Sequence, residues 1–392
     1  MRAPCRAVNH NLGVMSMPPF PMAGVFVRVE VCFERSPRRT ASLGEKLIPD
    51  VFIMNLELIR LRSQVVKAVR TFFDGEGFFE VQTPRLVGLP GQEPYLEPFW
   101  TEVIEANGAK HAAALITSPE YAMKRLLAAG MDKIYDLGPC FRNHEPWDGS
   151  HDPEFLMIEW YRREAGLEAL LRDTEAMIRS VAQAVGKERE QRWQSALATP
   201  FRVLTVREAM QRYAGVDISP LLEDREGMAQ VVAAHGQSVH EADTWDDLFF
   251  KLFLSEVEPK LGWTDDRSGW QPTFLTHYPA SMAALARKAT DDPRYALRTE
   301  LYIGDLELAN GFAELSDEAE QRKRFEEERQ LRASLGKPTW GLDERFLTAL
   351  PGMGDAAGIA FGVERLVMLL AGAGSITDIL PFSARERFDV KG

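Results

Sequence analysis

The stretch that decides the fold is "CFRNHEPWDGSHDPEFLMIEWYRRE", residues 140–164. Two candidate strands flank a polar loop, which predicts a hairpin. If 153–163 is a strand, side chains alternate, so Phe155, Glu159 and Tyr161 share one face. The other face is purely apolar and belongs against helices. A ring, a carboxylate and a phenol are costly to bury together without a ligand.

The ends of this hairpin carry the groups that interact with anions or protons. Arg142 ends the first strand, and its planar guanidinium could hold a phosphate or a carboxylate. Glu145 and His151 stand in the loop beside it. The alternative interpretation is a solvated sheet face with a surface hairpin, and this segment alone favours neither.

A second hairpin is predicted in "RTELYIGDLELANGFAEL", residues 298–315. Gly304 begins a two-residue loop, and counting back from it pairs Tyr302 with Glu307. Glu300 is then a diagonal neighbour of Glu307, ~7–8 Å away at the backbone. Converging carboxylates repel unless a cation lies between them, so an oxygen-lined Mg²⁺ site is predicted. The alternative is a charged exposed hairpin, which the apolar residues nearby disfavour.

A third candidate segment, "GIAFGVERLVMLLAG" (358–372), reads as a short strand running into an apolar helix. Arg365 falls in the first turn, where the helix dipole disfavours a cation unless an anion is near. The preceding "GMGDAAG" (352–358) matches a dinucleotide fingerprint but lacks the strand before it, so it is interpreted as a loop. Together the three segments suggest ATP with Mg²⁺, bound on an antiparallel sheet.

The composition limits the function classes. The chain has 392 residues, a net charge of −12 and three cysteines without zinc spacing. No apolar run approaches the ~20 residues of a membrane span, and no secretory signal is visible. A cytoplasmic protein without a membrane partner is therefore predicted. The negative charge argues against a large, sequence-independent nucleic-acid grip.

The chain divides into an irregular N-terminal extension, 1–50, and a catalytic domain, 51–392. Strands and helices occur in blocks without βαβ alternation, which indicates an α+β fold. Segment 199–243 gives no clear pattern. Strands are predicted at 78–84, 111–117 and in the two hairpins, and helices over 55–75, 118–130, 166–186, 244–258 and 317–335, with Ser118 as the N-cap of the second.

Beyond these physical arguments, the motifs resemble those of a known family. "GFFEVQTP", "FRNHE…HDPEF" and "GIAFGVER" are similar to the three signature motifs of class II aminoacyl-tRNA synthetases. "TSPEYAMKRLL", "HDPEFLMIEWY" and "ELANGFAEL" resemble the lysyl branch. The similarity covers about 55–383. It implies a six- or seven-stranded antiparallel sheet flanked by helices, and a homodimer formed through the first motif.

Several features resemble lysyl-tRNA synthetase paralogues that attach (R)-β-lysine to a lysine of translation elongation factor P. Only about fifty residues precede the first helix, too few for a five-stranded anticodon-binding barrel. "YPASMAALA" (278–286) lacks a glutamate usual in tRNA-charging relatives, Ala360 replaces their glycine, and "PFS" (381–383) replaces "FP". The resemblance implies ATP-dependent ligation of lysine or β-lysine to this factor, with tRNA an unlikely acceptor.

The resemblance also implies roles for individual residues. The catalytic residues would be Arg142, Glu307 and Arg365, and Mg²⁺ would be held by Glu300 and Glu307. ATP would be bound by Arg142, Asn143, His144, Glu145, His151, Asp152, Phe155, Glu307, Leu308, Gly362 and Arg365. The amino acid would be bound by Ser118, Glu120, Glu159, Tyr161, Glu314 and Ala360. No protein nucleophile is expected, so catalysis would consist of positioning and electrostatics.

The nucleotide loop departs from the family pattern. His144 stands where the family has glutamate, with Glu145 one place later, and the loop to His151 is one residue longer and lacks an arginine. Asp152 replaces a neutral amide. These changes leave three alternatives open: a tRNA-charging enzyme, an asparagine-synthetase-like ligase, and a non-catalytic amino-acid-binding module.

Overall fold

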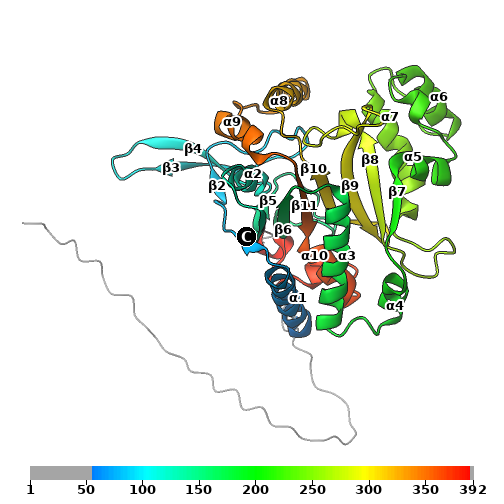
Figure 1. Ribbon diagram of the computed structural model, residues 1–392, viewed down its shortest axis with the longest axis horizontal. Coiled ribbons are helices and arrows are strands. Elements are labelled where there is room, and N and C mark those ends of the chain that lie inside the picture. Colours follow the sequence, from blue (N-terminus) through cyan, green and yellow to red (C-terminus); the bar gives the residue numbers. More distant parts are fainter. Residues whose placement is uncertain (1–54, 389–392) are drawn as a thin grey trace, which may run out of the picture. The chain divides into compact units, whose positions relative to one another are not determined.

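One sheet of eight strands organises the part of the chain that the computed structural model describes, residues 55–388 (Figure 1). These residues belong to one compact unit. Across the sheet the order is β1 (Phe79–Glu80), β5 (Lys133–Phe141), β6 (Glu154–Arg163), β11 (Ala356–Gly362), β10 (Leu306–Ala313), β9 (Tyr295–Ile303), β8 (Thr273–Pro279) and β7 (Arg202–Thr205). The predicted extension, residues 1–50, lies outside the described residues.

The strand pairings confirm the α+β class. The inner strands from β5 to β8 pair antiparallel, whereas β1 joins β5 and β7 joins β8 in parallel. The sheet has eight strands, not the predicted six or seven, because these short edge strands extend it. With two and four residues, β1 and β7 are too short to produce a recognisable alternation in the sequence.

Helices cover the apolar face of the sheet, as β6 predicts (Figure 1). Ile158 and Trp160 point into this layer and are fully buried there. The first helix begins where predicted, because the Asn55 side chain accepts the backbone N–H groups of Glu57 and Leu58 at 3.2 and 3.3 Å. The helices of this layer are α1 (Leu56–Gly75), α3 (Leu167–Ala184) and α10 (Val363–Ala371).

A second helical group packs beside β5 and β6, where Tyr121 stacks on Phe346 with centroids 4.1 Å apart. It consists of α2 (Glu120–Ala128), α8 (Glu318–Ser334) and α9 (Glu344–Met353). The predicted N-cap role of Ser118 is wrong: Pro119 precedes the helix, and the Ser118 hydroxyl is 3.4 Å from the Glu120 N–H. As predicted, the "GMGDAAG" segment joins a helix to β11 and does not open a nucleotide-binding helix.

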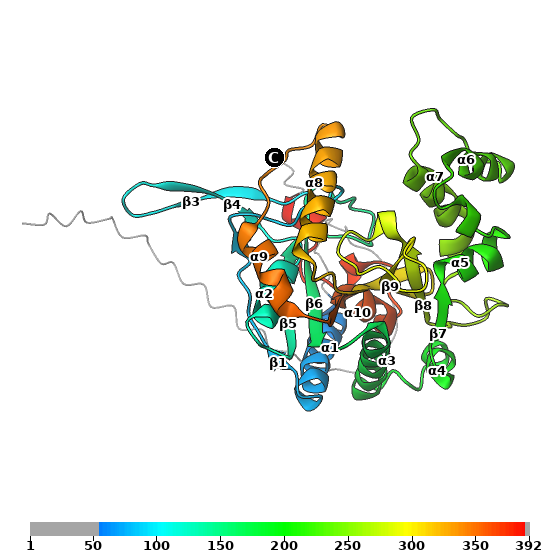
Figure 2. The same cartoon turned by 45° about the horizontal axis from the view of Figure 1, so that its top comes forward.

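The uninformative segment folds as a separate helical cluster around β7 and β8 (Figure 2). Its helices are α4 (Gln191–Ala198), α5 (Val206–Ala209), α6 (Arg225–Ala234) and α7 (Trp245–Leu252). The helix predicted over 244–258 is α-helical only to Leu252 and continues as a π-helical turn, Phe253–Val257. The chain's last described helix is α11 (Ala384–Phe388).

A small antiparallel sheet projects from the body as a hairpin (Figure 1). It contains β2 (Leu86–Val87), β3 (Trp100–Ile104) and β4 (Lys110–Leu115). The strand predicted over 78–84 is limited to β1, because the Thr83 N–H bonds the Asp136 side chain at 2.9 Å and no ladder partner. Within residues 55–388, no helix has the length and apolar character needed to cross a membrane.

Candidate active site

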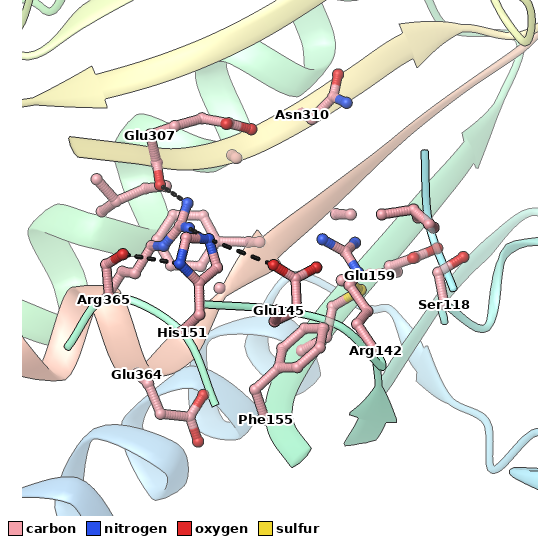
Figure 3. Close-up of a pocket in the computed structure, with 18 of the residues that line it drawn as sticks. Ser118, Arg142, Glu145, His151, Phe155, Glu159, Glu307, Asn310, Glu364 and Arg365 are labelled. Atoms are coloured by element: carbon pink, nitrogen blue, oxygen red, sulfur yellow. Dashed lines mark hydrogen bonds and ion pairs between the residues drawn. The ribbon is translucent and has the colours of Figure 1, made fainter. Parts of the chain in front are cut away.

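A cavity of about 240 Å³ lies on the opposite face of the sheet from the helical layer (Figure 3). The polar face of β6 forms its floor, as the hairpin pattern predicts, and β10, β11, the loop after β5 and the start of α2 form its walls. The predicted site residues that line it are Ser118, Glu120, Arg142, Glu145, His151, Asp152, Phe155, Glu159, Glu307, Leu308, Ala360, Gly362 and Arg365. A single site therefore brings the three sequence segments together.

The other predicted residues do not line the cavity. Asn143 donates its backbone N–H to the carbonyl of Glu97 at 2.7 Å, and His144 is exposed. Tyr161 and Glu314 are buried behind the cavity wall. Gly358 makes room for them, because a Cβ there would lie 2.1 Å from the Tyr161 ring.

Arg142 sits at the centre of the cavity, between the groups predicted for the nucleotide and those predicted for the amino acid (Figure 3). Its guanidinium carbon lies 5.1 Å from the centroid of the Phe155 ring. The Nε of Arg142 is buried and has no hydrogen-bond partner. A buried donor without a partner is costly, so this position fits an anion such as a phosphate.

Arg365 projects from the first turn of α10 toward the loop that joins β5 to β6 (Figure 3). It donates to the backbone carbonyl of Glu307 at 2.6 Å and lies 3.2 Å from Nε2 of His151. The same His151 nitrogen is 3.9 Å from a carboxylate oxygen of Glu145. The carbonyl and the imidazole orient this arginine, whose planar face can then stack on a base.

Gly362 ends β11 next to Arg365. A Cβ there would meet the Arg365 side chain at 3.7 Å and the Leu308 carbonyl at 3.8 Å, which are ordinary contacts. The surrounding protein therefore does not require a glycine at this position. Open space beside an arginine and a phenyl ring fits the predicted nucleotide, whose approach a side chain would hinder.

The carboxylate pair on the β9–β10 hairpin is only partly as predicted. Glu307 pairs with Tyr302, as counted from the turn, but a bulge at Leu308 places Glu300 opposite Asn310. Glu300 does not line the cavity; its carboxylate accepts the hydroxyl of Tyr302 at 2.7 Å and also pairs with Tyr278 and Arg298.

The charge of Glu300 still acts on Glu307. Burial and repulsion by Glu300 raise the pKa of Glu307 to about 7. The neighbouring Asn310 presents a buried side-chain oxygen without a partner to the same cavity. Two uncommitted oxygen groups fit a hard divalent cation, although residues 55–388 contain no cluster of three or more acidic, His or Cys side chains that would hold one alone.

The opposite end of the cavity is acidic. Tyr161 donates its hydroxyl to Glu159 at 2.9 Å, and Glu159 is 1% exposed. Burial and repulsion by Glu120 raise the pKa of Glu159 to about 8. Ala360 pairs with Glu159 across β6 and β11, so its methyl group limits the space beside this carboxylate. The arrangement favours a ligand with positive charge.

Lys124 of α2 was missed by the sequence analysis. Its ammonium is buried between two predicted substrate ligands, paired with Glu120 and 2.6 Å from Glu314. Burial alone would lower the pKa of Lys124, but both carboxylates raise it. The only available signal was the (i, i+4) spacing of Glu120 and Lys124. These two acids therefore already share a cation of the protein itself.

Glu93 also lines the acidic end and was not predicted. Burial and repulsion by Glu120 raise its pKa. It belongs to an irregular Gly- and Pro-rich segment without periodicity. Buried Arg332 of α8 fixes this segment, since it donates to the carbonyls of Glu93 and Leu96 at 2.9 and 2.8 Å.

With this geometry known, comparison with protein families gives a clear result. Residues 54–386 match the family model of class II tRNA synthetases (D, K and N). The chain belongs to this family. The class II synthetase is 38% identical to the "Elongation factor P--(R)-beta-lysine ligase" of Proteus mirabilis over 82% of this chain and 93% of that protein.

Further relatives carry the same name. The protein from Photorhabdus laumondii is 38% identical over 82% of this chain and 93% of its own length. The one from Haemophilus ducreyi is 36% identical over 85% of this chain and 95% of its own length. These relatives support the expected lysyl branch of the class II synthetases.

The longer nucleotide loop of this class II synthetase has a simple geometric explanation. His144 adopts a left-handed conformation with φ of 60° and turns outward, while Glu145 lines the cavity. Left-handed backbone is uncommon for residues other than glycine, although histidine is enriched among the exceptions. The extra residue is thus absorbed at His144, and Glu145 occupies the cavity side.

Proposed function

We propose that this class II synthetase is an ATP-dependent ligase that adenylates (R)-β-lysine or lysine and transfers it to a lysine of translation elongation factor P. One observation carries the proposal: the cavity joins an unpartnered arginine donor, Arg142, to an acidic end at Glu159. A nucleotide phosphate suits the first and an amino-acid ammonium the second. The names of the relatives support the same acceptor.

In the first proposed step, a carboxylate oxygen of the amino acid attacks the α-phosphorus of ATP, and pyrophosphate leaves. Arg142 would stabilise the charge that develops on the phosphate, while Phe155 and Arg365 hold the adenine between them. Glu159, supported by Tyr161, would orient the side-chain ammonium. In the second step, the acceptor amine attacks the acyl carbon, AMP leaves, and an amide forms.

Mg²⁺ is proposed at Glu307, whose cavity-facing carboxylate has a raised pKa. Magnesium is commonly bound by one or two carboxylates together with substrate phosphates, which suits the small donor set here. When bound, the ion would neutralise charge on the phosphates. Direct ligation by Glu300 stays a prediction, since its oxygens bond to two tyrosines and Arg298.

We further propose a homodimer formed through α1 and β1, where Leu56 and Phe79 are 56% and 63% exposed. Exposed large apolar side chains on the first motif suit a partner subunit. The catalytic domain is proposed to span 51–392, and the family match begins at 54. A cytoplasmic location and a protein acceptor, with tRNA unlikely, complete the proposal.

The test is amino-acid-dependent ATP–pyrophosphate exchange with (R)-β-lysine, L-lysine, aspartate and asparagine. We expect exchange with the two dicationic substrates only. Transfer is then followed by the intact mass of elongation factor P, with total tRNA as a parallel acceptor. Exchange with aspartate or asparagine alone would contradict the lysyl assignment, and absence of all exchange would favour a binding module.

A further inference from the structure

The nucleotide loop is fastened to the C-terminal part of the chain. The carbonyl of Gly149 accepts the Ile376 N–H at 2.8 Å and the Ser375 hydroxyl at 3.1 Å. Arg385 of α11 donates to the carbonyl of Trp147 at 2.7 Å. The loop that carries Glu145 and His151 is therefore held by residues more than two hundred positions later.

Aromatic packing strengthens this attachment. The Trp147 ring stacks on Phe388, with centroids 6.1 Å apart and an interplanar angle of 28°. Trp147 stands in the part of the loop where the family carries an arginine. Phe388 is the last residue of α11, so loop and helix are joined at both ends.

The tightest link is made by Asp152, which lines the cavity and is only 3% exposed. One carboxylate oxygen accepts the Ala384 N–H at 2.7 Å, and the other accepts the Glu154 N–H at 3.1 Å. Arg387 forms an ion pair with the same carboxylate and bonds Glu154 at 2.7 Å. These three donors satisfy Asp152 without help from a ligand.

A buried carboxylate beside a nucleotide site raises a physical problem. An unpaired charge at this depth is strongly unfavourable, and it would also repel the phosphates of a nucleotide. The related sequences described above have a neutral amide at this position. The positive charge of Arg387 removes both difficulties, because the pair with Asp152 is neutral as a whole.

We propose that Arg387 is a positioning residue of the nucleotide site. It neutralises Asp152 and anchors the loop between β5 and β6, so that this chain can carry aspartate where its relatives carry an amide. The inference rests on the proposed binding of ATP in this cavity. Arg387 itself does not line the cavity and is not assigned any contact with the nucleotide.

The test compares Arg387→Met, Asp152→Asn and the double variant in ATP–pyrophosphate exchange. We expect Arg387→Met to raise the KM for ATP about tenfold, with kcat within about threefold, because an unpaired buried charge disturbs binding. Adding Asp152→Asn should return the KM to within about threefold of the starting protein, since a neutral amide needs no cation. A KM unchanged in Arg387→Met, or no recovery in the double variant, would overturn the inference.

Controls separate this result from misfolding and from failure of the proposed function. Arg294→Met removes an exposed ion pair with Asp292 elsewhere on the surface and should leave the KM unchanged. Arg387→Lys keeps the charge and should stay close to the starting protein if Arg387→Met does not fold. If the unmodified protein neither exchanges pyrophosphate nor binds a non-hydrolysable ATP analogue in calorimetry, the proposed function fails before the variants are compared.

Discussion

The two ends of the cavity satisfy their charges in opposite ways. At the nucleotide end, the Nε of Arg142 is buried without a partner. At the acidic end, Glu159 bonds Tyr161, and Glu120 and Glu314 share Lys124. The first end therefore gains a partner when an anion arrives, whereas the second must exchange partners or protons. Binding at the two ends should respond differently to mutation and to pH.

Both ends nevertheless contain a carboxylate whose pKa lies close to neutrality. Burial and a neighbouring carboxylate raise the pKa of Glu307 to about 7 and that of Glu159 to about 8. Each group ionises readily when a cation comes near. At Glu307 that cation would be divalent, and at Glu159 it would be an ammonium group.

The largest effect is expected from removing the unpartnered cation. Arg142→Ala should lower kcat/KM in ATP–pyrophosphate exchange about 10²- to 10³-fold, because charge on the α-phosphate then lacks its donor. Arg142→Lys should recover only part of this, since an ammonium lacks the planar fork. The control Arg207→Ala removes an exposed pair with Asp217 and should change little. Equal activity of Arg142→Ala and the control would contradict the assignment.

A smaller but global effect is expected at the acidic end. Lys124→Met leaves Glu120 and Glu314 buried without their shared cation, so the free energy of unfolding should fall by about 3 kcal/mol. Chemical denaturation measures this change directly. Lys110→Met is the matched control, because Lys110 pairs with Glu102 at the surface and should contribute less than about 0.5 kcal/mol. Equal losses in both variants would mean that the buried lysine does not stabilise the acidic end.

Periodic patterns were enough to predict the scaffold of the site. Alternation in β6 separated the cavity face, with Glu159, from the core face, with Trp160. The two-residue turn at Gly304 fixed the pairing of Tyr302 with Glu307. Both results follow from local rules, since a strand alternates with period two and a short loop sets the register.

What could not be predicted depends on contacts distant in sequence. The bulge at Leu308 turned Glu300 away from the cavity, and no residue pattern marks it. Lys124 reaches Glu314 only through the packing of α2 beside the sheet. Likewise, the attachment of Asp152 to Arg387 joins two segments that the fold alone brings together. The roles assigned to individual site residues remain predictions.

The pH dependence separates the acidic end from the rest of the cavity. In the free protein Glu159 is mostly protonated below pH 8, and the ammonium of lysine favours its ionised form. Affinity for lysine should therefore rise about tenfold per pH unit from 6 to 8 and level off above. Calorimetry in two buffers of different ionisation enthalpy measures the proton released. Glu159→Gln should flatten the profile, and a flat profile in the unmodified protein would contradict this reasoning.

The smallest effect concerns a single methyl group. Ala360 faces Glu159 across the strand pair, so Ala360→Gly enlarges the amino-acid end without removing any charge. The ratio of kcat/KM for (R)-β-lysine over L-lysine should shift toward L-lysine by about tenfold, the usual scale for one carbon in a pocket. Ala357→Gly is the matched control: the residue lies on the same strand, but its side chain packs in the core. Both variants should lose about 1 kcal/mol of stability, as glycine does in a strand, but only Ala360→Gly should move the ratio. If the ratio moved equally in both, general loosening of β11 rather than the space beside Glu159 would determine which lysine isomer is used.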